Sequence, residues 1–365
     1  MNPVEIEFPA ILLVIVLFYW FAPYASQSTI KFGVRVTPER TIDPVFNKML
    51  GTYHAWLAIA SVLIFTLFIL IPDFYGFFPI NTLSFLVEIV AVYSIYFVIH
   101  GRVKRFKELN GWYQGVREAA GVVIPVTGPL KKDYVYPVML AFSAVIVVAT
   151  IIMGAILYPS LPNTLVTHYA QNGIPNGFER KNLIDVFNFP ILQAILTVSL
   201  FLVSLAIWRS RQEIEVFKPR TSYLQQQKFK KYNRYAFAAI SISVNVTIML
   251  LAAIHWGILN RDYGSSLIYL PISAIILVYP PMIYLGQQGS RIKIGFPEQP
   301  TGLVNMNDDE FWKGGVIYLN RKDRSFVVAK RFGIGWTINF GNPISWIILA
   351  TIFIIPLIGV ILVFH

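Results

Sequence analysis

The chain has 365 residues, of which 56% are hydrophobic and only 13% are charged. This composition lies above the roughly half-apolar usage of soluble domains and is typical of a membrane protein. Because the chain contains no cysteine, disulfides, thiolate metal sites and cysteine nucleophiles are excluded. The net charge of +11 does not indicate a nucleic-acid partner, because the basic residues lie between apolar segments, where they set orientation in a bilayer.

Eight stretches have the roughly twenty apolar residues needed to cross a hydrocarbon core about 30 Å thick. We therefore predict an all-α membrane protein, a polytopic bundle of about eight transmembrane helices. The predicted spans cover residues 9–26, 55–72, 79–99, 135–157, 187–208, 235–256, 266–286 and 343–364.

Lysine and arginine are distributed unevenly among the predicted loops. Loops 27–54, 100–134, 209–234 and 287–342 carry 27 of the 30 basic residues, and the alternate loops carry three. Basic residues are retained on the cytoplasmic side during insertion. We therefore expect these four loops to be cytoplasmic and both termini to be extracytoplasmic.

This topology divides the chain into five predicted parts. Residues 1–134 form a three-helix membrane part with basic inner loops, and 135–208 form a helix-loop-helix with an extracytoplasmic loop. Residues 209–286 hold a basic inner loop and helices six and seven, 287–342 form a small cytoplasmic domain, and 343–365 form the last helix.

The polar loop at residues 161–181 is rich in proline and glycine, which favour a compact loop with a defined path. Its pattern consists of Leu161, Pro162, His168, Gly173, Pro175, Gly177 and Lys181. This pattern resembles a domain of unknown function in bacterial polytopic membrane proteins, including the SdpI-related immunity proteins. Ala170 stands where that family often has Asn. The resemblance implies a multi-pass protein of the bacterial cell membrane that is associated with toxin immunity and, in some members, with holding a transcriptional repressor at the membrane.

The chemistry of His168 allows a zinc ligand, a general base or a pH-sensitive hydrogen-bonding group. The nearest carboxylate in the loop is Glu179, eleven residues away, whereas a catalytic zinc needs about three protein ligands. We therefore predict no metal site. Two alternatives stay open: His168 and Lys181 bind a ligand, or they tie the loop down by hydrogen bonds.

The segment 287–342 is long for a connector, so we expect it to fold. The β-favouring runs "VIYL" and "SFVVA", separated by "NRKDR", predict a β-hairpin. The segment resembles a second domain of unknown function that often accompanies the first. The matching residues are Trp312, Lys313, Gly315, Tyr318, Asn320, Lys330, Arg331, Gly333, Gly335, Trp336, Thr337 and Asn339.

Two interpretations of this basic and aromatic segment stay open. Lys330, Arg331 and Trp336 form either a patch for anionic lipid headgroups or a cytoplasmic partner, or an interfacial anchor with turn glycines. Gly333 and Gly335 are not a nucleotide fingerprint, because Ile338 stands where the third glycine would be.

Glu88 lies near the middle of the third predicted span, where an ionisable group is costly and marks a functional candidate. Pro280 and Pro281 should kink or break the seventh helix. No motif for a hydrolase or ATPase occurs.

We therefore predict a non-enzymatic protein without cofactors that acts in toxin immunity or envelope sensing. A peptide toxin or envelope ligand would bind the outer loop, a regulatory protein would bind the segment from Trp312 to Trp336, and the bilayer would surround the helices. The alternative is a proton- or substrate-coupled transporter or flippase that uses Glu88 and the broken seventh helix.

Overall fold

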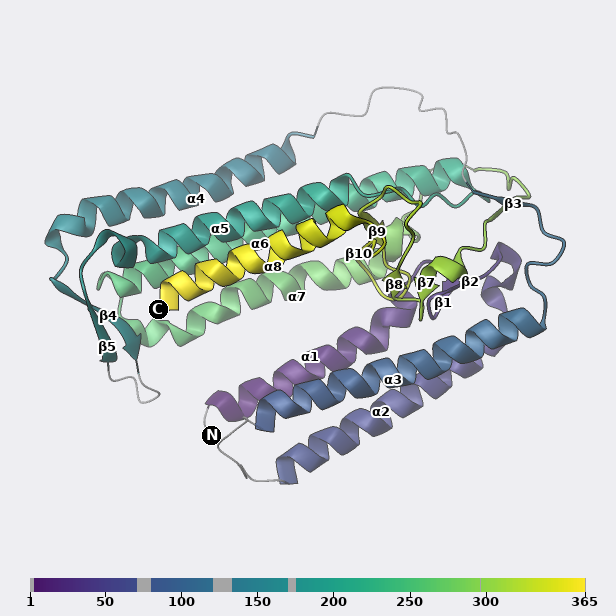
Figure 1. Ribbon diagram of the computed structural model, residues 1–365, viewed down its shortest axis with the longest axis horizontal. Coiled ribbons are helices and arrows are strands. Elements are labelled where there is room, and N and C mark those ends of the chain that lie inside the picture. Colours follow the sequence, from purple (N-terminus) through teal and green to yellow (C-terminus); the bar gives the residue numbers. More distant parts are fainter. Residues whose placement is uncertain (1–2, 71–79, 121–132, 170–174, 296, 365) are drawn as a thin grey trace. The chain divides into compact units, whose positions relative to one another are not determined.

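The computed structural model describes residues 3–70, 80–120, 133–169, 175–295 and 297–364. The described chain is mostly helical (Figure 1), and each predicted span overlaps one helix. The helices are α1 (Pro3–Ala25), α2 (Val45–Leu70), α3 (Ile80–Leu109), α4 (Val135–Leu157), α5 (Leu183–Trp208), α6 (Pro219–His255), α7 (Tyr269–Leu285) and α8 (Pro343–Phe364).

Five helical segments in the described part are long and apolar enough to cross a membrane, so the chain is a membrane protein. They are Val45–Leu67, Leu83–Leu109, Val135–Ser160, Leu183–Trp208 and Pro219–His255. Two other apolar helices, over Leu12–Ala25 and Tyr269–Leu285, are shorter. The expected total of about eight spans stays a prediction.

The chain forms two compact units, and both are discontinuous in sequence. Unit 1 consists of Met1–Pro125, Arg211–Gln227 and Met282–Asn342, and unit 2 consists of Val126–Ser210, Lys228–Pro281 and Pro343–His365. The chain passes from one unit to the other within α6 and within α7. The five-part division by sequence stays a prediction about topology.

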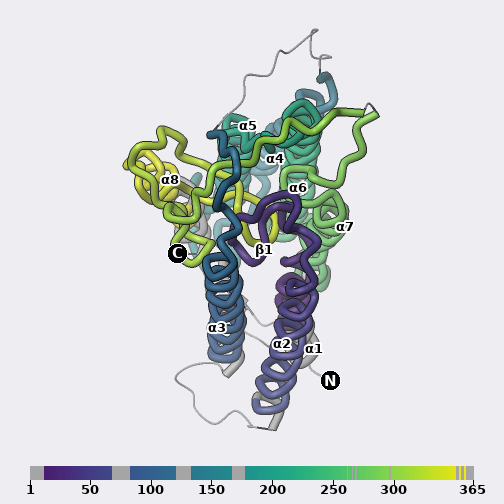
Figure 2. Tube along the Cα trace, turned by 90° about the vertical axis from the view of Figure 1, so that its right-hand side faces the viewer, coloured from purple at the N-terminus to yellow at the C-terminus, as the bar shows by residue number. Residues whose placement is uncertain are grey.

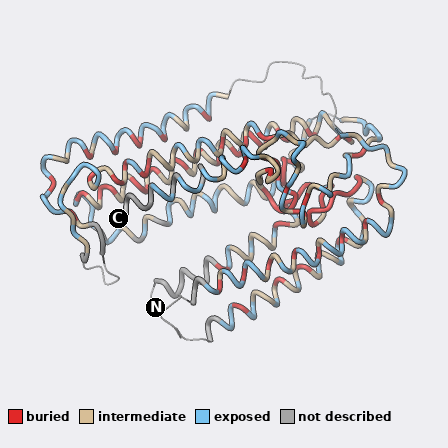
Figure 3. Tube along the Cα trace, viewed as in Figure 1, coloured by how far each residue is buried: buried red, intermediate tan, exposed pale blue. Residues whose placement is uncertain are grey.

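In unit 1, helices α1, α2 and α3 run side by side (Figures 1 and 2). Their ends support a domain of short strands: β1 (Ile30–Lys31), β2 (Val34–Arg35), β3 (Glu118–Ala119), β6 (Val304–Asn305), β7 (Trp312–Lys313), β8 (Ile317–Tyr318), β9 (Val327–Ala329) and β10 (Trp336–Ile338). Strand β3 pairs with β6 in parallel, and β1 pairs with β2 in antiparallel fashion. Buried residues concentrate where these strands gather (Figure 3). One hydrophobic cluster joins the domain to the helices through Phe32, Tyr53, Tyr96 and Phe332.

The predicted pairing of "VIYL" with "SFVVA" is wrong. Strand β8 pairs instead with β7, and β9 pairs with β10, both in antiparallel fashion. Glycines with positive φ decide this, because they supply the chain reversals: Gly314 and Gly315 follow β7, and Gly333 and Gly335 precede β10. The "NRKDR" segment makes a turn held by side chains, in which Lys322 N donates to Asn320 Oδ1 at 3.0 Å.

Of the kink or break expected in the seventh helix, the break is absent, and the kink stays a prediction. Helix α7 runs from Tyr269 to Leu285 and contains both Pro280 and Pro281. Each proline removes one backbone donor, but the helical path continues through both positions.

Unit 2 contains α4, α5, α8, most of α6, and the strands β4 (Thr164–Tyr169) and β5 (Pro175–Arg180). Helix α5 packs against α4 and α8. Buried amides link the helices: Gln193 Nε2 donates to Asn245 O at 2.8 Å, and Asn245 Nδ2 donates to Ser143 Oγ at 2.7 Å. This agrees with the packing role that polar groups commonly have between membrane helices.

Candidate functional site

The proline- and glycine-rich loop is an antiparallel hairpin formed by β4 and β5. His168 lies opposite Gly177, and Tyr169 lies opposite Pro175, with irregular register on both sides of His168. Gly173 lies outside the described residues, and the side chains of His168 and Pro175 are also outside what the structure describes. The role of the His168 imidazole therefore stays a prediction.

Lys181 anchors the base of this hairpin. Its ammonium donates to the carbonyl oxygens of Tyr158 at 3.2 Å and Leu161 at 2.8 Å, and it lies 5.2 Å from the centre of the Tyr158 ring. Leu165 of β4 packs with Leu161 in a buried cluster that includes Trp256. Of the two interpretations of Lys181, this geometry supports the structural tie.

Strand β5 presents the accessible part of the hairpin. The sheet has two strands, and within the described residues neither outer edge pairs with another strand. Phe178 of β5 is 60% exposed, whereas β4, the strand that pairs with β5, contributes Leu165 to a buried hydrophobic cluster. An anchored strand with an open edge and an exposed aromatic side chain can accept an extended peptide.

Unit 1 contains a buried ion cluster made from segments distant in sequence. Asp308 accepts from Arg35 Nε at 2.7 Å and also pairs with Arg331. Asp309 accepts from Lys107 Nζ at 2.6 Å and from the main-chain N–H of Arg35 at 3.0 Å. The guanidinium of Arg331, only 1% exposed, also pairs with Asp309.

Glu213 and Glu215 extend the cluster. Glu213 pairs with Arg35, and Glu215 accepts from the hydroxyl of Thr29. Burial raises the pKa of Glu215, although Arg35 opposes this effect.

The pKa values of the two aspartates move in the opposite direction from that of Glu215. Burial alone would raise the pKa of Asp308, but the charges of Arg35 and Arg331 outweigh it and hold that pKa well below its usual range. In the same way, Arg331 and Lys107 overcome burial and lower the pKa of Asp309.

The structure places the predicted basic and aromatic residues in different environments. Arg331 points inward, with its guanidinium 4.9 Å from the centre of the buried Trp312 ring. Lys330 and Lys313 are exposed, and Lys313 Nζ donates to Glu310 O at 3.1 Å. The predicted lipid or partner contact therefore depends on Lys330 and Trp336 rather than on Arg331.

The motif glycines serve close packing. An ideal Cβ on Gly315 would lie 2.9 Å from Gly33 Cα, so the two backbones touch. The hydroxyl of Tyr96 donates to the carbonyl of Gly314 at 3.0 Å beside this contact. The main-chain N–H groups of Gly333 and Gly335 donate to Ser26 Oγ at 3.0 Å and Gln287 Oε1 at 2.9 Å.

The sequence interpretation missed the acidic half of the cluster and the role of its basic half. No buried role was predicted for Lys107, Glu213, Asp308 or Asp309, and Arg35 was placed in a basic cytoplasmic loop without an ion-pair partner. One signal was available: "NDDE" at residues 307–310 is an acidic run in a chain with only 19 acidic residues.

Glu88 of α3 is 2% exposed, and its carboxylate accepts from Ser61 Oγ of α2 at 2.7 Å. Within the described residues no basic side chain is paired with it. The described residues also contain no group of three His, Cys, Asp or Glu that could hold a metal ion.

The architecture is that of a multi-pass membrane protein with a folded polar domain in one unit and an anchored hairpin in the other. Residues 145–194, which include the hairpin, match the "Domain of unknown function (DUF1648)". Residues 321–346, which include Arg331, match the "Family of unknown function (DUF5808)". No curated protein and no solved structure matches the chain.

Proposed function

We propose that this chain is a non-enzymatic membrane protein that recognises an extended peptide at the β4–β5 hairpin, in the manner of an immunity or envelope-sensing protein. The observation that carries the proposal is the open edge of β5 beside the exposed Phe178, on a hairpin fixed by Lys181. Main-chain pairing with such an edge gives affinity, and an aromatic side chain adds specificity. The resemblance to SdpI-related proteins and the match to DUF1648 over residues 145–194 support this assignment.

The basic-loop distribution supports an orientation with the hairpin outside a bacterial cell and the polar domain of unit 1 inside. In this orientation the peptide and the regulatory partner bind on opposite sides of the membrane. The buried ion cluster would keep the inner domain in one conformation for such a partner.

Orientation is directly measurable, because the natural chain has no cysteine. Phe178→Cys and Lys322→Cys each place one thiol at an exposed position. A membrane-impermeant maleimide should label Phe178→Cys in intact cells and Lys322→Cys only after permeabilisation. The reverse labelling would reject the proposed orientation.

Recognition is tested by deleting the gene and challenging the cells with a panel of membrane-active peptides. The deletion should increase sensitivity, and the wild-type gene should restore resistance. At equal protein abundance, Phe178→Ala should restore less resistance than Phe142→Ala, because Phe142 is a comparably exposed aromatic residue (54%) on α4, away from the hairpin. Unchanged resistance in the deletion strain would count against the immunity function, and equal rescue by both variants would count against the hairpin site.

A second candidate function, proton-coupled transport, is favoured by Glu88. Glu88 lies inside a membrane helix and has a serine partner but no cationic partner among the described residues, so its charged form is costly and the group suits proton exchange. Purified protein in vesicles with an imposed pH gradient should then conduct protons, as reported by an internal pH-sensitive dye, and Glu88→Gln should stop this flux. Wild-type vesicles no leakier than empty ones would reject the transport function.

A further inference from the structure

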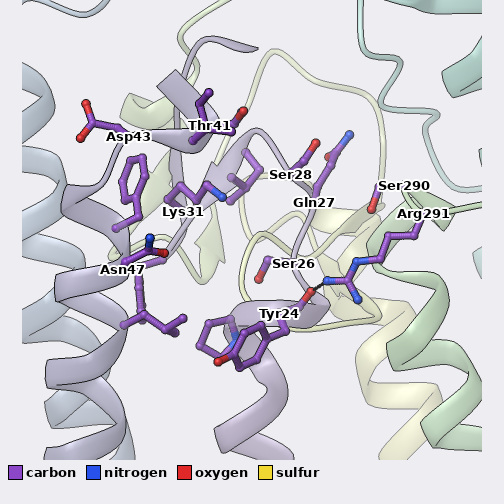
Figure 4. A pocket seen from close by; sticks show the side chains of 16 residues that line it. Tyr24, Ser26, Gln27, Ser28, Lys31, Thr41, Asp43, Asn47, Ser290 and Arg291 are labelled. Atoms are coloured by element: carbon purple, nitrogen blue, oxygen red, sulfur yellow. Dashed lines mark hydrogen bonds between the residues drawn. The ribbon is translucent and has the colours of Figure 1, made fainter. Parts of the chain in front are cut away.

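Unit 1 contains a cavity of about 490 Å³, lined by both polar and apolar residues, where α1 ends and α2 begins. It is lined by Tyr24, Ser28, Lys31, Asn47, Ser290 and Arg291, among others (Figure 4). These residues come from three stretches of the chain: the end of α1 with β1, the start of α2, and the segment after α7. Its position at the ends of two apolar helices places it at the height of lipid headgroups in a membrane.

Two cations face this cavity. Lys31 Nζ lies 5.5 Å from the centre of the Phe46 ring and forms no ion pair with any described residue. Arg291 donates to main-chain carbonyl oxygens of Ile283 and Tyr284, each at 3.4 Å, and of Tyr24, so it too lacks a carboxylate partner among the described residues. Burial lowers the pKa of Lys31, and the charge of Arg291 lowers it further.

The carboxylate in the cavity wall does not neutralise this pair. Asp43 accepts from the main-chain N–H of Val45 at 3.1 Å, at the start of α2. Figure 4 shows its carboxylate directed away from Lys31 and Arg291. A bound anion would supply the missing negative charge between the two cations.

The α1 surface next to the cavity is apolar. Leu17 and Phe21, which lie eight and four residues before the end of α1, are each 45% exposed. An anionic group in the cavity that carries an acyl chain could therefore lay that chain along α1. Free phosphate would contact Lys31 and Arg291 but would leave the apolar surface of α1 uncovered.

We propose that the cavity binds the phosphate group of an anionic phospholipid, with Lys31 and Arg291 as its cationic contacts and α1 as the surface for its acyl chain. This site is separate from the β4–β5 hairpin and does not depend on the function proposed above. It also differs from the predicted patch around Lys330 and Trp336.

The experiment measures lipid retention by native mass spectrometry on the purified full-length protein. Phosphatidylglycerol should be retained, and phosphatidylcholine should not. In the double variant Lys31→Gln/Arg291→Gln, the affinity for phosphatidylglycerol should fall by roughly tenfold or more, since each basic contact contributes on the order of 1 kcal/mol. The control Lys48→Gln removes an exposed charge of α2 that does not line the cavity, and it should behave as the wild type does.

A second variant tests the same site in case the double variant fails to fold. Ser28→Glu adds a negative charge at an exposed position of the cavity wall without removing a cation. It should also weaken the retention of phosphatidylglycerol while leaving the gel-filtration profile unchanged. A further measurement tests whether inorganic phosphate alone stabilises the purified protein. Stabilisation by phosphate without retention of phosphatidylglycerol would overturn the lipid assignment, and equal retention by the wild type and both cavity variants would overturn the site.

Discussion

The substitution Asp308→Asn tests whether the buried ion cluster holds unit 1 together. The amide preserves size but removes the charge that pairs with Arg35 and Arg331, whose side chains are 3% and 1% exposed. Removing one partner of a buried pair costs about 3–5 kcal/mol, because the other charge stays buried. Arg35 retains Glu213 and Arg331 retains Asp309, so we expect the lower end, about 3 kcal/mol.

A change of that size is measurable as a shift in the thermal midpoint. Each kcal/mol corresponds to roughly 2–4 °C for a unit of about 200 residues, so the midpoint of detergent-solubilised protein should fall by roughly 6–12 °C. The control is Asp133→Asn, because its partner Lys231 is 41% exposed and lies 3.8 Å away. Such exposed pairs contribute about 0–1 kcal/mol. If Asp308→Asn lowers the midpoint no more than Asp133→Asn does, the cluster does not stabilise the domain as we infer.

A double-mutant cycle separates pairing from independent damage. Asp308→Asn combined with Arg331→Gln should destabilise the protein by less than the sum of the two single effects, because each substitution removes the partner of the other. Strict additivity would show that the two charges do not interact in the folded protein.

Three other predictions follow from the same unit. The folded-state pKa values of Asp308 and Asp309 are lowered, so their stabilisation is complete above the unfolded pKa of about 4 and declines as the pH falls below it; thermal midpoints between pH 6 and pH 3 should show this decline, and Asp308→Asn should flatten it. The pKa of Glu215 is raised, so its contribution is lost as the pH rises through the folded value; Glu215→Gln should therefore match or exceed the wild-type midpoint at pH 8, and a lower midpoint would contradict this. Gly315→Ala should cost about 2 kcal/mol, because its Cβ meets Gly33 at 2.9 Å and its φ is +73°, whereas Gly295→Ala, with nothing within 4 Å, should leave the midpoint unchanged.

The membrane class and the positions of the apolar helices could be predicted from the sequence, because hydrophobicity over about twenty consecutive residues is a local property. A compact loop at residues 161–181 was predicted from proline, which fixes its own φ, and from glycine, which accepts positive φ. The antiparallel pairing of β4 with β5 in that loop was not predicted. Strand pairing in the polar domain could not be predicted in this way. The runs "VIYL" and "SFVVA" both favour extended structure, but this preference does not determine which strand each of them pairs with. Positive-φ glycines in the folded chain selected the pairing.

Which charges are buried was decided only by the tertiary structure. Arg35 and Asp308 are separated by 273 positions, and Arg331 lies 298 positions from the Gly33 carbonyl to which it donates. An interaction between such residues depends on their distance in space and on the loss of water around them, and neither quantity is encoded in a local window. The sequence therefore predicted only a basic cytoplasmic loop around Arg35, although Val34, Arg35 and Val36 lie at the centre of the packed domain, each 2% exposed or less.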